Sequence, residues 1–289
     1  MMTYRDDSPI CQTTAPDAKS GDTNGGASIL QRNAIAAPDI DYTGERIVPG
    51  KIPENLFLEH EARYVFAGGF VNGMRVLDVA CGSGIGTHYL LKAGAQSCLG
   101  FDIDRSAIDY ASAVYGDCVF TQCEAVNLCL PDNSIDVVVS FETIEHVMDQ
   151  LTFLRECKRV LRPGGRLICS TPNRTISRWG QKNPFHFREL TVVEFADLLT
   201  SMFSEVQLYA QKCRIYPVFV ARKVLLGVLE KLRLTEPTKR FLRWKPTRTI
   251  PRTEFGDNPN DLNGITQLHH ASSLIQPMFT IAVGRKPLH

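Results

Sequence analysis

Short apolar runs and amphipathic segments alternate along the middle of this chain. Continuous apolar or β-branched runs predict buried strands, and apolar residues at helical spacing predict helices. Strands are expected at residues 74–80, 97–103, 118–122, 135–141, 166–170, 205–209 and 278–284. Helices are expected at residues 54–68, 84–93, 105–115, 148–161 and 191–203. Repeated alternation of the two predicts an α/β fold, a doubly wound parallel sheet with helices on both faces.

Two of the expected helices carry local boundary signals. Pro163-Gly164-Gly165 follows the helix at 148–161 and should end it, because neither residue type continues a helix well. Thr191 precedes another helix, with Glu194 three residues later. This spacing is typical of a capping box, so we expect a helix to begin there.

The sequence on either side of this pattern has a different composition. Residues 1–40 are rich in small and polar residues without periodicity, and we expect a disordered tail there. Residues 41–289 then form the folded domain, with a partly helical insertion at about 212–275 before the last expected strand. Within this insertion, residues 212–252 hold twelve Lys or Arg and two acids.

The basic insertion has three interpretations. It is a solvated helix that packs as a lid or dimer face, or it is attracted to an anionic membrane surface or a lipid-linked substrate. Binding to nucleic acid is the weakest alternative, because no RNA-binding motif accompanies the charge.

Composition fits a globular protein with a sizeable core. The chain has 289 residues, of which 44% are hydrophobic, and a net charge of +1. Its nine cysteines show no C-x-x-C pair and no zinc spacing, so we expect reduced, mostly buried thiols. No signal peptide and no membrane-spanning run is visible. The expected location is therefore cytoplasmic, with association at the membrane surface as an alternative.

The residues that follow the first expected strand carry the most specific chemistry. Asp78 is followed by Gly82, Gly84 and Gly86. Such a turn lets a ligand lie against bare backbone, with the N–H groups of the next helix aimed at it. A dinucleotide fingerprint would need glycine at position 87, which is Thr87. The spacing instead resembles motif I of the class I S-adenosylmethionine-dependent methyltransferases.

Further blocks of the sequence extend this resemblance. Residues 123–136 resemble the family's G-D-A-x-x-L-P-F-x-D-x-S-F-D block, with Cys123 and Glu124 in place of Gly and Asp. Residues 137–147, which end in Glu145-His146-Val147, resemble its motif IV region, and residues 161–167 resemble its L-x-P-G-G-x-L block. The resemblance implies S-adenosylmethionine as cofactor and a Rossmann-like sheet of seven strands with an antiparallel last strand.

In such enzymes two acidic residues hold the nucleoside. Asp102 closes the second expected strand, where its carboxylate can accept two hydrogen bonds from the ribose diol. A helix N-cap is the alternative role, which Asp104 fits better. Glu124 keeps an acceptor for the adenine amino group, although it is longer than the usual Asp. The resemblance implies further cofactor contacts from Asp78, Ala80, Gly82, Gly84, Ile103, Ala125 and Glu142.

The sequence leaves two alternative roles open for two residues of the first expected helix. Arg63 and Tyr64 would either meet the carboxylate and the methionine end of the cofactor or belong to a solvated helix face.

Transfer of a methyl group requires an acceptor held in line, and an alcohol acceptor must also lose its proton. His146 and His186 are the candidate bases, and their alternative roles are to brace a nearby helix and to order a loop. Nothing resembles the carboxylate cluster of the magnesium-dependent catechol enzymes, so no metal site is expected.

The acceptor is indicated only by weaker resemblances. Residues 42–46, 170–174 and 183–187 resemble segments of methyltransferases encoded among glycan-building enzymes and, more distantly, of quinone-pathway O-methyltransferases. We therefore expect O-methylation of a sugar hydroxyl on a glycan or glycolipid precursor. The alternatives are a quinone or other small-molecule acceptor, and a non-catalytic module that binds the cofactor.

Overall fold

The protein is represented by a computed structural model that describes residues 40, 46–48, 50–215, 220, 221, 224, 265–268 and 275–288. Nearly all of the expected N-terminal tail, the segment 42–45 and most of the basic insertion lie outside these residues, so the expectations for them stay predictions. In the described ranges, no helix combines the length and the apolar character that crossing a membrane requires.

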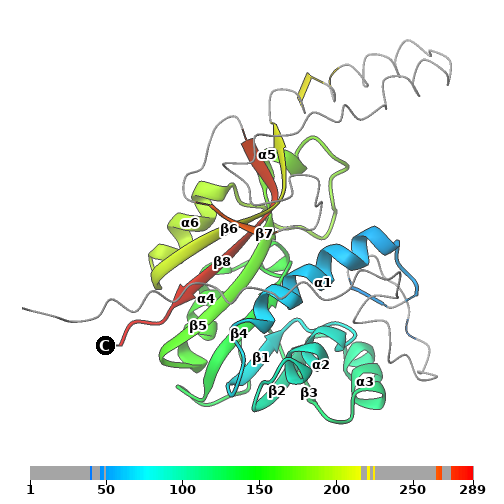
Figure 1. Ribbon diagram of the computed structural model, residues 1–289, viewed down its shortest axis with the longest axis vertical. Helices are drawn as coiled ribbons and strands as arrows, with labels where there is room; N and C mark the ends of the chain where they lie inside the picture. The colour runs from blue at the N-terminus through cyan, green and yellow to red at the C-terminus, as the bar shows by residue number, and fades with distance from the viewer. Residues whose placement is uncertain are drawn as a thin grey trace, which may run out of the picture.

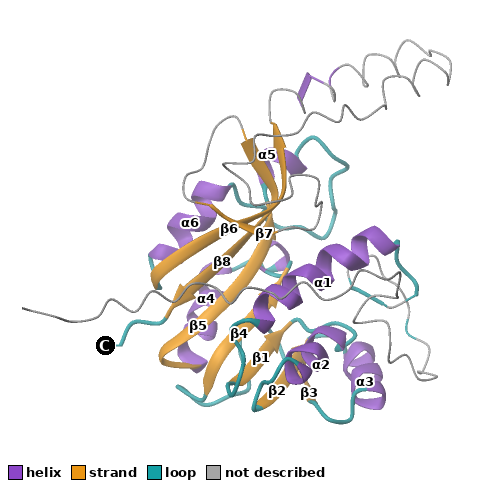
Figure 2. Ribbon diagram, viewed as in Figure 1, coloured by secondary structure: helices purple, strands orange, loops and turns teal. Residues whose placement is uncertain are grey.

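One mixed sheet forms the centre of the described structure (Figure 2), with strand order β3-β2-β1-β4-β5-β8-β6-β7. Its strands are β1 (Arg75–Val79), β2 (Ser97–Asp102), β3 (Val119–Gln122), β4 (Ile135–Phe141), β5 (Leu161–Pro172), β6 (Ser204–Ile215), β7 (Ile265–Leu268) and β8 (Ile275–Arg285). The pairs among β1 to β5 are parallel, and β8 runs antiparallel to both β5 and β6. The seven expected strands are confirmed, and β7 is an additional strand at the edge.

Helices cover both faces of this sheet (Figure 1), as the sequence predicts. They are α1 (Glu54–Gly68), α2 (Ile85–Lys92), α3 (Arg105–Val114), α4 (Gln150–Val160), α5 (Arg174–Ser177), α6 (Val192–Thr200) and the 3₁₀ turn η2 (Ile144–His146). The capping box at the start of α6 is confirmed, because the Thr191 and Glu194 side chains each accept a hydrogen bond from the other's backbone N–H.

Successive residues of the central strands point to opposite sides of the sheet. Val138 of β4 packs with Phe153 of α4 and Phe195 of α6 in one core, whereas Val137 packs with Leu90 of α2 in the other. Every residue of β4 is buried, as its apolar run Val137–Val139 predicts. Its two polar residues have partners, since Asp136 pairs with Arg75 and the Ser140 hydroxyl donates to the Val79 carbonyl. Burial of Phe153 and of Phe195 contributes about 1.5–3 kcal/mol each, so the layer of α4 and α6 is held firmly against its face of the sheet.

Candidate functional site

A cavity of about 880 Å³ lies where β1, β2, β3 and β4 end. The neighbours of β1 in the sheet are β2 and β4, so the chain order of the strands reverses beside it. In open α/β sheets, ligands bind outside the carboxyl ends of the strands at such a switch point. The lining includes eight residues predicted to hold cofactor or acceptor, namely Ala80, Gly82, Asp102, Ile103, Glu124, Ala125, Glu142 and His146.

The three glycines after β1 have different roles. Gly82 lines the cavity with a φ of 54°, and a methyl group there would come no closer than 3.6 Å to another side chain. Gly84 has a φ of 78°, does not line the cavity, and would place a Cβ 2.6 Å from Ala111. At Gly86 a Cβ would lie 2.0 Å from the Tyr64 ring. Gly82 therefore leaves room beside the cavity, while Gly84 and Gly86 permit close packing around α2.

Asp102 fastens the turn after β1 to the end of β2. One carboxylate oxygen accepts a hydrogen bond from the Gly82 N–H at 2.8 Å, and the other accepts from the Asp104 N–H at 2.9 Å. The carboxylate lines the cavity and keeps acceptor capacity on both oxygens, as a ribose diol would require. Asp104 is the N-cap of α3 and pairs with Arg46, so the capping role belongs to Asp104.

Asp78, the acid at the start of the motif, lies beneath the cavity rather than in its lining. It is fully buried and accepts hydrogen bonds from the Thr87 hydroxyl at 2.7 Å and the Tyr64 hydroxyl at 3.3 Å. Burial raises its pKa to about 7 in spite of these hydrogen bonds. Asp78 thus supports the turn from below, and Thr87, which stands where a dinucleotide fingerprint has glycine, is one of its partners.

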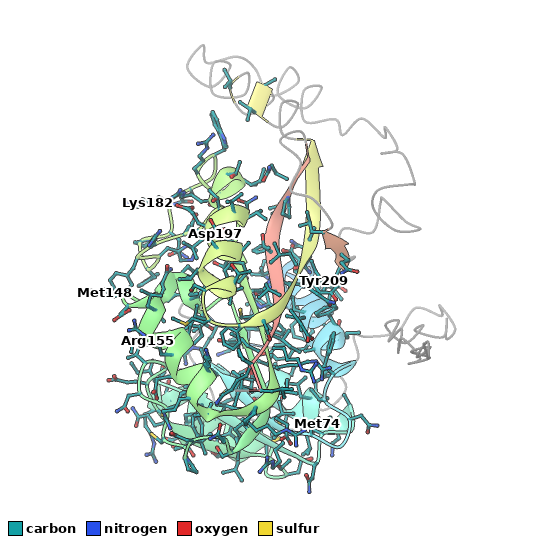
Figure 3. All side chains as sticks on the ribbon, turned by 90° about the vertical axis from the view of Figure 1, so that its left-hand side faces the viewer. Met74, Met148, Arg155, Lys182, Asp197 and Tyr209 are labelled. Atoms are coloured by element: carbon teal, nitrogen blue, oxygen red, sulfur yellow. The ribbon has the colours of Figure 1, made fainter. Side chains whose placement is uncertain are left out.

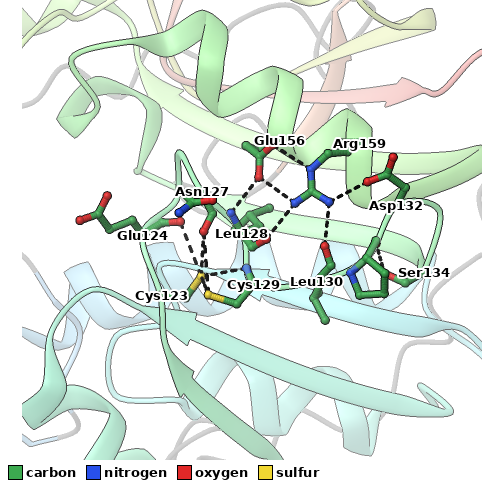
Figure 4. A network of polar contacts seen from close by, with 11 residues as sticks. Cys123, Glu124, Asn127, Leu128, Cys129, Leu130, Asp132, Ser134, Glu156 and Arg159 are labelled. Atoms are coloured by element: carbon green, nitrogen blue, oxygen red, sulfur yellow. Dashed lines mark hydrogen bonds and ion pairs between the residues drawn. The ribbon is translucent and has the colours of Figure 1, made fainter.

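Arg159 and Glu156 on α4 hold the loop after β3 in place through hydrogen bonds to its backbone (Figure 4). The guanidinium donates to the carbonyls of Leu128 and Leu130 at 2.8 and 2.7 Å. Glu156 accepts from the Leu128 N–H at 2.8 Å. Glu124 lies at the start of this loop with its side chain directed away from these contacts, and it lines the cavity.

Ala80 and Glu142 occupy equivalent positions directly after β1 and β4. Both have positive φ values, 61° and 51°, which are uncommon for residues with a side chain. Such backbone costs about 1–3 kcal/mol and tends to occur at functional sites, and here both residues line the cavity. The Glu142 carboxylate accepts from the Ser170 hydroxyl at 2.7 Å and lies 3.4 Å from Arg63.

The structure gives Arg63 and Tyr64 separate roles. Tyr64 lines the cavity, but Arg63 is fully buried and lies outside the lining. Its guanidinium donates to Gln211 at 3.1 Å and sits 4.6 Å above the Phe279 ring. Arg63 thus matches neither the direct cofactor contact nor the solvated helix face that the sequence left open.

The lining also holds residues that were not predicted as site residues, among them Arg46, His60 and Glu61. Burial, with a further effect from Arg63, holds the pKa of His60 well below its usual range, so this imidazole is neutral. His60 and Glu61 lie on α1, which follows no strand of the sheet. The rule that sites lie at strand ends therefore gives no signal for them.

The two candidate bases lie side by side but are placed differently. Their rings meet edge to face with centroids 4.7 Å apart. His146 lines the cavity, and its Nδ1 donates to the Phe185 carbonyl at 3.2 Å. His186 is outside the lining. Its Nδ1 donates to Glu189 at 2.6 Å, and its Nε2 accepts from the Asn183 amide at 3.0 Å.

Glu145 lies directly before His146 and is completely buried. One carboxylate oxygen accepts from the Thr171 hydroxyl at 3.0 Å, whereas Oε1 has no hydrogen-bond partner among the described residues. Burial and the neighbouring Glu142 carboxylate raise its pKa well above the usual range.

Apolar side chains form an exposed rim around the cavity, which we call the apolar rim. Four lining residues belong to it, Ile103, Met148, Phe185 and Phe187, with exposed fractions of 65%, 80%, 55% and 63%. Figure 3 shows Met148 projecting from the molecular surface. Exposed apolar groups gathered around one cavity are typical of a ligand-binding mouth.

Comparison with known proteins matches residues 77–169 to the family described as "Methyltransferase domain". A probable S-adenosylmethionine-dependent methyltransferase of Mycolicibacterium smegmatis is 41% identical over 172 residues, which are 58% of this chain and 66% of that protein. A ubiquinone biosynthesis O-methyltransferase of Bradyrhizobium diazoefficiens is 32% identical over 175 residues, 56% of this chain and 68% of that protein.

A solved structure shares the fold. It is an S-adenosylmethionine-dependent methyltransferase from Thermotoga maritima, 17% identical, with a TM-score of 0.53 over 81% of this chain and 94% of that one.

The sheet order, the glycine turn and the cavity at the switch point define a Rossmann-like nucleotide-binding protein. With the relatives above, the chain belongs to the S-adenosylmethionine-dependent methyltransferase family. The predicted cofactor class is thereby confirmed. The chain spans 66% of the length of the Mycolicibacterium smegmatis relative and 62% of the length of a similar probable methyltransferase of Mycobacterium tuberculosis, so the activity of the whole protein is a proposal.

Proposed function

We propose that this protein transfers the methyl group of S-adenosylmethionine to an oxygen atom of an acceptor with an apolar part. One observation carries the proposal: a single cavity is lined by Gly82, Asp102 and Glu124, which were predicted to hold the nucleoside, by His146, and by the apolar rim. Two ligands bound in one cavity lie close together, which is what a direct transfer between them requires.

The cofactor part of the site fits a nucleoside. Asp102 offers acceptor lone pairs to two neighbouring hydroxyl groups, and Glu124 offers a carboxylate to an exocyclic amino group. Gly82 allows the ligand to approach the backbone. The bound cofactor supplies a methyl group that its sulfonium already makes electrophilic, so the protein has only to bind, orient and exclude water.

The acceptor part of the site holds a group that can take a proton. The hydrogen bond from His146 Nδ1 to the Phe185 carbonyl leaves the lone pair on Nε2. His146 at the cavity is therefore the general base for a hydroxyl acceptor. His186 contacts the ring of His146 and is tied to Glu189, so we assign it a bracing role.

The apolar rim favours a phenolic or lipid-linked acceptor over a bare sugar. Met148, Phe185 and Phe187 would bury apolar surface, whereas a free sugar presents hydroxyl groups on all sides. Several curated relatives carry the name ubiquinone biosynthesis O-methyltransferase, which agrees with an aromatic hydroxyl. A sugar hydroxyl on a glycolipid is the second candidate, supported by the basic composition of residues 212–252, which would attract an anionic carrier.

An assay with methyl-labelled cofactor tests the proposal. The full chain is incubated with a prenylated phenol, a short-chain glycolipid or a free disaccharide, and label transfer is measured. We expect transfer to the phenol and none to the disaccharide. Transfer to the glycolipid alone would favour the second candidate. Absence of transfer to all three acceptors, with intact cofactor binding, would favour the non-catalytic module instead.

A further inference from the structure

Three side chains with metal-binding donors meet beside the cavity. Glu145 and His146 belong to η2, and His186 comes from the loop after α5. One carboxylate oxygen and one nitrogen from each ring lie within 4.8 Å of one another. We propose that Glu145, His146 and His186 bind a divalent transition-metal ion, which departs from the expectation drawn from the sequence.

The unsatisfied oxygen of Glu145 is an independent indication of a ligand. The side chain is completely buried, and Thr171 satisfies only one of its two carboxylate oxygens. Oε1 has no hydrogen-bond partner within the part of the chain that the structure describes. Buried polar atoms are nearly always paired, because losing water without a replacement costs free energy. A bound cation would supply the missing partner.

Both imidazole rings are oriented as metal ligands usually are. A ligating histidine typically donates its second ring N–H to a backbone carbonyl or a carboxylate. His146 donates from Nδ1 to the Phe185 carbonyl, and His186 donates from Nδ1 to the Glu189 carboxylate. Nε2 therefore carries the lone pair in each ring. The Asn183 amide donates to Nε2 of His186, and a metal bond would take the place of this contact.

The donor set and its spacing narrow the choice of ion. Zinc bonds to nitrogen and oxygen are about 2.0–2.2 Å long, so the ligand atoms of a tetrahedral site lie about 3.3 Å apart. The donor atoms here lie within 4.8 Å of one another, so each pair must approach by at most about 1.5 Å when the ion binds. Two imidazoles and one carboxylate suit Zn²⁺ and similar ions, whereas Mg²⁺ prefers oxygen ligands. Glu142 is paired with Arg63, so we leave it out of the ligand set.

An ion at this position would border the acceptor side of the cavity, because His146 is part of the lining. Three protein ligands leave a coordination position open, as in catalytic zinc sites, where the ion acts as a Lewis acid toward a bound oxygen. This role rests on the proposed function and would assign His146 to the metal rather than to proton removal. The binding of the metal does not depend on that function.

A second cluster in the described residues provides a matched control. His88, Asp117 and Cys118 also lie within reach of one ion, but Lys92 already pairs with Asp117 at 2.6 Å. Burial raises the pKa of the Cys118 thiol to about 12, which keeps it protonated and poorly suited to metal binding. The His88→Ala variant should therefore keep the affinity for the metal.

The test uses the full chain after treatment with a chelator and removal of the chelator. Zn²⁺ binding is measured by calorimetry, and Co²⁺ binding by visible absorption. We expect one equivalent of metal and Co²⁺ d–d bands without a thiolate charge-transfer band. Glu145→Gln, His146→Ala and His186→Ala should each weaken Zn²⁺ binding by more than about 100-fold. Glu189→Gln, which acts through His186, should weaken it by about 10–100-fold.

Binding of S-adenosylmethionine by the same preparations reports whether each variant is folded and separates the two claims. Wild type that binds the cofactor but shows no Co²⁺ absorption would overturn the metal site and leave the proposed function intact. A thiolate charge-transfer band in the Co²⁺ spectrum would also overturn the metal site. So would loss of Zn²⁺ binding in His88→Ala with binding unchanged in the other variants. Metal binding without cofactor binding would instead contradict the proposed function.

Discussion

The cavity has two sides that are built in different ways. On the cofactor side, after β1 and β2, the site is formed mainly by backbone, because the Gly82 turn is held in place by a hydrogen bond from the Gly82 N–H to Asp102. On the acceptor side, after β4, ionisable side chains from separate segments meet, with the buried Glu145 beside His146 and His186. In the proposed function the first arrangement binds the cofactor and the second contacts the acceptor. The second also holds Glu145 Oε1, a buried oxygen without a hydrogen-bond partner among the described residues.

The largest expected effect concerns packing on the cofactor side. Gly86→Ala would place a methyl group 2.0 Å from the Tyr64 ring, so α1 or α2 must move. We expect a loss of about 3 kcal/mol in the free energy of unfolding, measured by urea denaturation. Gly116→Ala is the control, since a Cβ there has no neighbour within 4 Å, and it should be close to neutral. Equal stabilities for the two variants would contradict the close packing described for the turn.

Asp78, beneath the same turn, should give stability a distinctive pH dependence. Its folded pKa of about 7 lies above the value of 3.8 for an exposed aspartate, so between these pH values the folded state binds more protons than the unfolded state. Raising the pH through this window therefore lowers stability, by up to about 1.4 kcal/mol per pH unit from this group. Asp78→Asn should remove this component, as measured by urea denaturation from pH 4.5 to 6.5. Parallel pH profiles for wild type and variant would refute the shift.

On the acceptor side, a substitution should raise stability at the expense of function. Glu145→Gln keeps the shape and replaces a buried group that ionises with a neutral amide. At pH 8 and without added metal, we expect the variant to be about 1 kcal/mol more stable in thermal unfolding. Glu156→Gln is the contrast, because it removes charge from a satisfied pair with Arg159 and should not stabilise the protein. A Glu145→Gln variant less stable than wild type would show that burial of this carboxyl group does not destabilise the folded protein.

The difference between the two sides also explains what the sequence could predict. The glycine turn and Asp102 lie in contiguous motifs at strand ends, and the structure places both at the cavity. β4 was predicted to the residue, because the β-branched run Val137–Val139 with Ile135 and Phe141 around it is typical of a buried strand. β5 and β6 extend beyond their predicted carboxyl ends. The added residues there pair with β8, which is distant in the sequence, so local patterns could not predict them.

Short or long-range features escaped prediction. η2, α5 and β7 have three or four residues each, too few for a periodic pattern. Arg63 was assigned to the cofactor or to solvent, yet it is buried against Gln211, which is far away in the sequence. The meeting of His186 with Glu145 and His146 depends on how the loop after α5 folds back, and no local spacing encodes it.

The central claim is that the turn after β1, held by Asp102, binds S-adenosylmethionine. Calorimetric titration of the cofactor into wild type, Asp102→Ala and Asp109→Asn tests it most directly. Two lost hydrogen bonds to a charged acceptor, at about 1.5–3 kcal/mol each, should weaken binding to Asp102→Ala by at least about 100-fold. Asp109, exposed and paired with Arg105 on α3, should be replaceable without effect. Wild-type affinity in Asp102→Ala, or no binding to wild type, would contradict the account.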